Sequence, residues 1–153
     1  MQLRYIGLSL LICLSCKPAF ADDELIKKAD LLWAYFDCAV YAELANPKMQ
    51  LSLFEKGMKI GREYYEAQLS GKITKEMVQQ IPLVISWRSG PTPDFLLGSL
   101  WEDRFNDIWE DVEKEYKCGM WSPIKPFHFT CEKKLREEMY KDKFREKNCA
   151  LLP

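Results

Sequence analysis

Residues 23–45, DELIKKADLLWAYFDCAVYAELA, are the stretch that decides the fold of this chain. Their apolar side chains recur three and four residues apart, the spacing that gathers side chains on one face of an α-helix. Because more than half of the circumference is apolar, we expect these residues to form the central and most buried helix. The main stripe comprises Leu25, Ala29, Leu32, Trp33, Phe36, Val40 and Leu44, and a second row comprises Leu31, Tyr35, Cys38, Ala42 and Ala45.

Both ends of this helix carry recognisable signals. Asp22 precedes it and is expected to cap it, because an Asp side chain accepts hydrogen bonds from the free N–H groups of a first helical turn. Asn46-Pro47 follows and is expected to end it, since the residue before a proline disfavours the helical conformation.

Residues 48–69 predict a second long helix with one apolar and one charged face. Gly57 and Gly61 lie about one turn apart on it. Because glycine has no side chain, we expect this pair to let another helix or a large side chain come close.

Residues 75–81 predict a short helix that Thr74 caps. Residues 82–87 have two interpretations. They form either a further helical turn that begins at Pro82, or a short extended segment, because the run is brief and contains β-branched residues.

Thr92-Pro93-Asp94 is the clearest helix start, with a capping threonine, a proline at the first helical position and an acid next to it. This helix is expected to end at Cys118-Gly119, where glycine suits the left-handed closing residue. Thr130 is expected to cap a last, highly charged helix over residues 131–147. The chain therefore predicts an all-α domain of four or five amphipathic helices. The apolar stripe of the helix that starts at Pro93 comprises Leu97, Leu100, Trp101, Phe105, Ile108, Trp109, Val112 and Tyr116.

Residues 1–21 have the three parts of a secretory signal: a basic start, a short apolar run and the Ala19-Phe20-Ala21 end that a signal peptidase recognises. We expect cleavage between Ala21 and Asp22, which leaves residues 22–153 as the mature helical domain in the periplasm or outside the cell. Two alternatives are a retained N-terminal helix and a lipid anchor on Cys16.

The mature chain has 20 basic and 23 acidic residues, a net charge of −3. A nucleic-acid-binding protein normally carries a basic excess on one face, so this composition argues against that class. No stretch after the signal reaches 18 uncharged apolar residues, so we expect no transmembrane helix in the mature chain.

Four cysteines remain after cleavage, and an even number in an exported protein predicts two disulfides. Cys131 and Cys149 lie at opposite ends of one predicted helix, about 27 Å apart, whereas a disulfide needs Cα atoms within about 7 Å. We therefore favour Cys118–Cys131 with Cys38–Cys149. The pairing Cys38–Cys131 with Cys118–Cys149 stays open. Neither a metal site nor any cofactor is predicted, because no Cys-x-x-Cys pair remains after cleavage and His128 is the only histidine.

No arrangement of side chains specifies a catalytic site. The acids of the helix that starts at Pro93 could bind a divalent cation or hydrolyse glycosides, but their spacing is equally that of a solvated helix face. His128 could serve as a base, but disulfide formation would remove the thiols as nucleophiles. Those acids are Glu102, Asp103, Asp107, Glu110, Asp111 and Glu113.

Two loops rich in aromatic residues and proline are the candidate binding segments. The connection over residues 120–129 carries Trp121, Phe127 and Phe129, and the loop over residues 87–95 begins with Trp87. Aromatic side chains on stiff backbone are typical of binding hot spots. The alternative is that these rings only cover the hydrophobic core.

These observations favour a non-catalytic exported binding protein, of the inhibitor or immunity type, that acts on another extracytoplasmic protein. A secreted hydrolase that uses carboxylates is one alternative, and a secreted helical signalling or effector protein is another.

Overall fold

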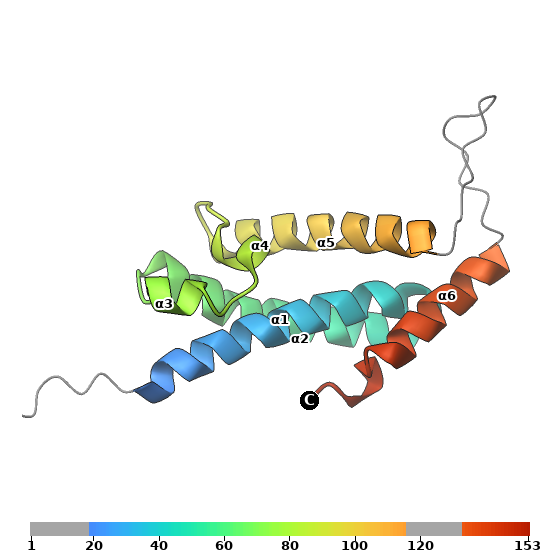
Figure 1. Ribbon diagram of the computed structural model, residues 1–153, viewed down its shortest axis with the longest axis horizontal. Helices are drawn as coiled ribbons and strands as arrows, with labels where there is room; N and C mark the ends of the chain where they lie inside the picture. The colour runs from blue at the N-terminus through green and yellow to red at the C-terminus, as the bar shows by residue number, and fades with distance from the viewer. Residues whose placement is uncertain (1–18, 116–132) are drawn as a thin grey trace, which may run out of the picture.

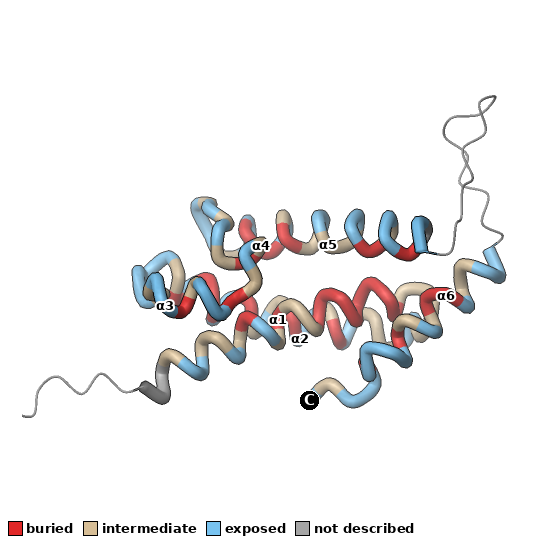
Figure 2. Tube along the Cα trace, in the orientation of Figure 1, coloured by how far each residue is buried: buried red, intermediate tan, exposed pale blue. Residues whose placement is uncertain are grey.

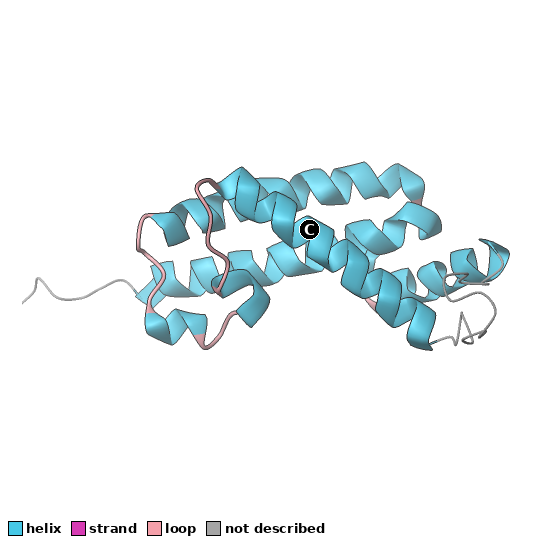
Figure 3. Cartoon of the chain, turned by 90° about the horizontal axis from the view of Figure 1, so that it is seen from above, coloured by secondary structure: helices cyan, strands magenta, loops and turns pink. Residues whose placement is uncertain are grey.

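The computed structural model describes residues 19–115 and 133–153, and this part of the chain contains helices and no strand (Figures 1 and 3). The predicted all-α fold is therefore confirmed for the described residues. The helices are α1 (Ala19–Ala45), α2 (Pro47–Leu69), α3 (Lys75–Val78), α4 (Leu83–Ser86), α5 (Pro93–Glu115), α6 (Lys133–Glu146) and the 3-10 helix η1 (Cys149–Leu151).

The long helices form two layers (Figure 1). Helices α1 and α2 are joined at Asn46 and lie side by side as an antiparallel pair. Helix α5 runs along one side of this pair, and α6 packs against the C-terminal half of α1 (Figures 1 and 3). None of the described helices is both long enough and apolar enough to span a membrane.

Helix α1 is the most buried element, as its sequence predicts. Every residue from Tyr35 to Ala42 is buried (Figure 2). A helix shows its whole circumference in eight residues, so neighbours must cover this part of α1 on all sides. One expectation is wrong: α1 begins at Ala19, so Asp22 lies in the first turn and does not precede the helix as its cap.

The paired glycines of α2 lie where side chains of other helices come closest. A Cβ atom on Gly57 would approach the ring of Phe36 to 2.7 Å, and one on Gly61 would overlap Leu97 of α5 and Leu32 of α1. The expected close approach is therefore confirmed at both positions.

Two predicted threonine caps are present. The Phe95 N–H donates to Thr92 Oγ1 at 3.2 Å, and the Met77 N–H donates to Thr74 Oγ1 at 3.3 Å. Each bond satisfies one of the N–H groups that a helix start leaves free.

The segment between α2 and α5 adds one helix to the expected four or five. Helix α3 ends at Val78 rather than at residue 81, and residues 83–86 form a separate turn, α4. The helical alternative for this run is therefore confirmed over the extended one. Pro82 lies immediately before α4, not at its first position, because its backbone is extended (φ −51°, ψ 125°).

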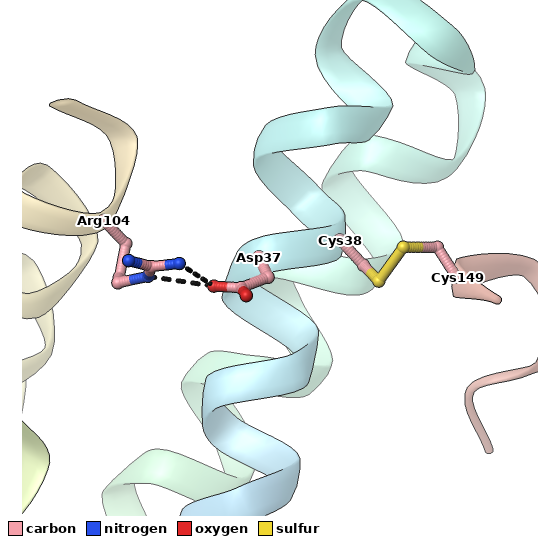
Figure 4. The surroundings of a disulfide bond; sticks show 4 residues. All are labelled: Asp37, Cys38, Arg104 and Cys149. Atoms are coloured by element: carbon pink, nitrogen blue, oxygen red, sulfur yellow. Dashed lines mark hydrogen bonds and ion pairs between the residues drawn. A yellow bond between two sulfur atoms is a disulfide. The ribbon is translucent and has the colours of Figure 1, made fainter. Parts of the chain in front are cut away.

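Cys38 and Cys149 form a disulfide, with Cα atoms 5.4 Å apart (Figure 4). This bond confirms one half of the favoured pairing and excludes the open alternative for these two cysteines. Cys118 and Cys131 lie outside the described residues. The disulfide ties η1, and α6 just before it, to the middle of α1.

Helix α6 presents only a thin apolar face, in agreement with its charged sequence. Met139, Tyr140 and Phe144 are buried, whereas Leu135 is 48% exposed. The segment after η1 also lies on the helical pair, because the Tyr35 hydroxyl and the Lys56 ammonium both donate to the carbonyl oxygen of Pro153.

Candidate binding surfaces and buried charges

Trp87 is the most exposed aromatic side chain in the described part of the chain, at 76%. Leu83, one turn earlier, is 61% exposed, and Phe95 at the start of α5 is 57% exposed. Helical spacing places Leu83 and Trp87 on one face, because α4 continues in helical conformation to Trp87. We call these three exposed apolar side chains of residues 83–95 the α4 patch.

The backbone beneath the α4 patch is held from two sides. The Gln68 side chain of α2 donates to the carbonyl oxygen of Arg88 at 2.8 Å. The Arg88 guanidinium in turn donates to Ser99 Oγ at 2.6 Å and to Asp103 Oδ2 at 2.5 Å, both on α5. The loop is therefore fixed to two helices while its large apolar side chains face solvent.

Among the predicted partner-binding residues, the structure places only Trp87. Trp121, Phe127 and Phe129 lie outside the described residues, as does His128. The sequence placed Phe95 in the candidate loop over residues 87–95 but did not single it out, and it did not single out Leu83 because an apolar residue in a short helix is usually part of the core.

The acidic residues of α5 whose side chains the structure describes lie on its outer surface, as expected for a solvated helix face. Five of them form ion pairs with basic side chains, so part of the negative charge of this face is neutralised. These pairs are Asp94–Arg62 at 2.7 Å, Asp103–Arg88 at 2.5 Å, Asp107–Arg104 at 3.6 Å, Glu110–Lys114 at 3.0 Å and Glu115–Lys143 at 2.7 Å.

Two of the described carboxylates differ from these, and the side chain of Glu113 lies outside the described part of the chain. Glu102 and Asp111 are exposed and have no ion-pair partner within residues 19–115 and 133–153. Within the same residues, no three His, Cys, Asp or Glu side chains come together as a possible metal site.

A groove of about 260 Å³ lies between α2 and α5. Four residues of α2 and one of α5 line it, so its formation depends on how the two helices pack. Sequence reasoning missed it for that reason; the one local signal is Leu51, an apolar side chain that stays 64% exposed. The lining residues are Pro47, Gln50, Leu51, Phe54 and Trp101.

A buried ion pair joins α1 to α5 (Figure 4). Arg104 donates to Asp37 Oδ1 through Nε at 2.9 Å and through Nη2 at 2.7 Å, and both side chains are 12% exposed. The same guanidinium lies over the Trp33 ring, 3.9 Å from its centroid. Burial raises the pKa of Asp37 above its usual value, although the attraction of Arg104 opposes that shift.

Asp37 and Cys38 are neighbours in α1 but serve different contacts. In Figure 4 the Asp37 carboxylate points to Arg104 of α5, whereas Cys38 points to Cys149 on the other side of α1. Adjacent positions in the middle of α1 therefore hold two parts of the chain that are distant in sequence.

The described residues thus contain the α4 patch, the groove between α2 and α5 and the buried Asp37–Arg104 ion pair. Comparisons of the chain with protein-family models, with curated proteins and with solved structures found no match.

Proposed function

We propose that this chain is an exported, non-catalytic binding protein that acts on another extracytoplasmic protein. The α4 patch carries the proposal. Its most exposed side chain, Trp87, is 76% exposed on a loop that Gln68 and Arg88 fix to α2 and α5. A fixed backbone lowers the entropy lost on binding, and tryptophan is the residue type most enriched in binding hot spots.

The disulfide supports the location. Cys38 and Cys149 are both buried and bonded, which fits an oxidising compartment such as the periplasm or the extracellular space. The signal-like residues 1–21 favour the same compartment.

The test is a binding assay that uses exported proteins of the source cell. The mature chain is immobilised, captured proteins are identified by mass spectrometry, and each candidate is purified and titrated by calorimetry. We expect a partner whose Kd rises at least tenfold for Trp87→Ala, the loss of a hot spot. The variant should fold normally because the side chain is exposed.

Leu151→Ala is the matched control. Leu151 is also a large apolar side chain, 79% exposed, but it lies in η1 near the C-terminal end of the described chain. Its removal should leave the Kd unchanged. Failure to find a partner among exported proteins would contradict the proposal, as would a partner that binds Trp87→Ala as tightly as the unmodified chain.

A further inference from the structure

The groove between α2 and α5 is apolar and already shaped. The Phe54 and Trp101 rings meet edge to face with centroids 4.8 Å apart, and both also contact the Phe36 ring, at 5.8 and 5.4 Å. Because Phe36 is completely buried, it fixes the two rings from below. Leu51 remains 64% exposed at the side of the groove. At about 260 Å³ the groove has room for one large side chain rather than for a drug-sized ligand.

The charges beside the groove are negative where Trp101 lies. Glu102 follows Trp101 in α5 and has no ion-pair partner in the described part of the chain. Helical spacing places it with Gly98 and Phe105, on the α2 side of the helix. A Cβ atom on Gly98 would meet nothing within 4 Å, so this side of α5 is open.

Asp111 is the other unpaired carboxylate of α5, but its position differs. It lies four residues after Asp107 and seven after Arg104, whose side chain contacts α1, so helical spacing places it on the α1 side. Of these two carboxylates, Glu102 is therefore the one that adjoins a residue of the groove, Trp101.

Helix α2 carries exposed charges of both signs, and Lys59 lies one turn after Glu55. Glu55, one turn after Leu51, is exposed and unpaired among the described residues. Lys48 adjoins Pro47 at the start of α2, where the helix dipole is also positive. A cation beside the groove is therefore favoured near Trp101 and Glu102, and disfavoured near Pro47.

Trp101 also lacks the cation that the other two core tryptophans have. Arg104 lies 3.9 Å from the Trp33 ring centroid, and Arg136 lies 4.5 Å from that of Trp109. Neither Trp101 nor the exposed Trp87 has such a partner within the described chain. A guanidinium near Trp101 would gain both the attraction of the ring and that of the Glu102 carboxylate.

We propose that the groove between α2 and α5 receives a large apolar side chain of a partner protein that carries a basic residue, Lys or Arg, directly beside it. The inference rests on the proposed function, because the occupant is a segment of another exported protein. The apolar side chain lies between Leu51, Phe54 and Trp101, and the basic side chain lies at Glu102.

The test uses two probe peptides, acetyl-Ala-Leu-Arg-Ala-amide and acetyl-Ala-Leu-Glu-Ala-amide, titrated into the isotopically labelled mature chain at low salt. The readout is the Trp101 indole N–H signal, assigned with Trp101→Phe. We expect the Arg peptide to shift this signal with a Kd at least about fivefold lower than that of the Glu peptide. Because the purified chain is used alone, this result does not depend on whether the α4 patch finds its partner.

Three variants locate the contact. Glu102→Gln should raise the Kd of the Arg peptide about fivefold, whereas Asp111→Asn, the matched control on the other side of α5, should leave it unchanged. Leu51→Ser should weaken both peptides. Trp87→Ala should weaken neither, which separates the groove from the α4 patch.

Several outcomes would overturn the inference. They are equal affinity for the two peptides, no shift of the Trp101 signal with either peptide at about 10 mM, and equal effects of Glu102→Gln and Asp111→Asn. A Trp101 signal that moves on dilution of the protein alone would assign the groove to a second copy of this chain instead. Peptide binding with no effect of Glu102→Gln would show an apolar site without selection for a cation.

Discussion

The Asp37–Arg104 pair shows how one buried charge depends on another. Both side chains are 12% exposed and belong to helices that are far apart in sequence. Removing two charges from water is unfavourable, and their mutual attraction offsets that cost only while both are present. The Trp33 ring adds a contact with the guanidinium. We therefore expect the protein to be more stable with both charged residues, or with neither, than with only one of them.

This reasoning predicts unequal effects of single and double substitutions. Arg104→Met leaves the Asp37 carboxylate buried without its partner and should lower the free energy of unfolding by about 3 kcal/mol. The double variant Asp37→Leu with Arg104→Met should recover most of that loss. Urea unfolding of the unmodified chain, Asp37→Leu, Arg104→Met and the double variant measures the coupling free energy. A double variant that loses as much stability as the two single variants together would refute the prediction.

Glu43 predicts a pH dependence of stability. Burial raises the pKa of its carboxyl, and Oε2 is buried without a hydrogen-bond partner. A carboxyl whose pKa is raised in the folded state loses stability on ionisation, so the loss begins near the unfolded value of 4.5 and grows as the pH rises through the folded value. Glu43→Gln should abolish this loss.

The measurement compares the two proteins by urea unfolding from about pH 3.5 to about pH 7.5, a range that begins below the usual carboxyl pKa and ends well above it. The unmodified chain should become less stable relative to Glu43→Gln as the pH rises. Parallel curves, or a relative gain in stability toward neutral pH, would contradict the assignment of the raised pKa to this residue.

At the scale of the elements, the close contact of α1 with α2 depends on one missing side chain. A Cβ atom on Gly57 would lie 2.7 and 2.8 Å from two ring atoms of Phe36, which is fully buried. Phe36 stacks on Phe54 and meets Trp101 edge to face, so its ring cannot move aside freely. Helix propensity alone would favour alanine over glycine here.

Gly57→Ala should therefore destabilise the protein by about 1–3 kcal/mol, since overpacking outweighs the gain in helix propensity. Gly98→Ala is the matched control, because a Cβ atom there has no neighbour within 4 Å. That variant should stabilise the protein by about 0.5–1 kcal/mol. Thermal unfolding of both variants checks the prediction, which fails if the two substitutions change stability in the same direction.

The attachment of α6 is the second question at this scale. Its buried face consists of only three side chains, and the Cys38–Cys149 bond joins residues 111 apart in sequence. A cross-link that closes so long a loop restricts the unfolded chain by up to about 5 kcal/mol. Packing of α1 on α2 does not involve this bond.

Replacing both cysteines by serine should therefore loosen α6 and η1 before it affects the α1–α2 pair. Hydrogen exchange by mass spectrometry should show faster exchange in residues 133–153 than in residues 53–67 of the variant, each relative to the unmodified protein. An equal increase in the two segments would show that the bond stabilises the whole molecule uniformly.

At the scale of the whole molecule, the proposal of an exported, oxidised protein can be tested on native material. Intact mass spectrometry should give a chain that starts at Asp22, with all four remaining cysteines resistant to alkylation before reduction. Cell fractionation should place it outside the cytoplasm. A retained Met1 or a free Cys38 or Cys149 thiol in the folded protein would contradict the proposal.

Some features of the fold could be predicted because they are local. The Thr92 and Thr74 caps depend on residues within one turn, and the central position of α1 follows from its continuous apolar surface. The start of α1 at Ala19 was missed, because an acid such as Asp22 suits a first turn as well as a cap. The α4 patch was found only through Trp87, because local sequence does not reveal whether Leu83 and Phe95 are covered.

The sequence by itself therefore determined the helical class, several helix ends and the close approach at Gly57 and Gly61, because periodicity, capping and side-chain size act over a few residues. Only the tertiary structure decided that Asp37 meets Arg104, that Cys38 bonds Cys149, and that Leu51 and Trp101 border one groove. These partners lie 67, 111 and 50 residues apart. Their meeting depends on which helix faces pack together, a choice that the apolar stripe of any single helix leaves open.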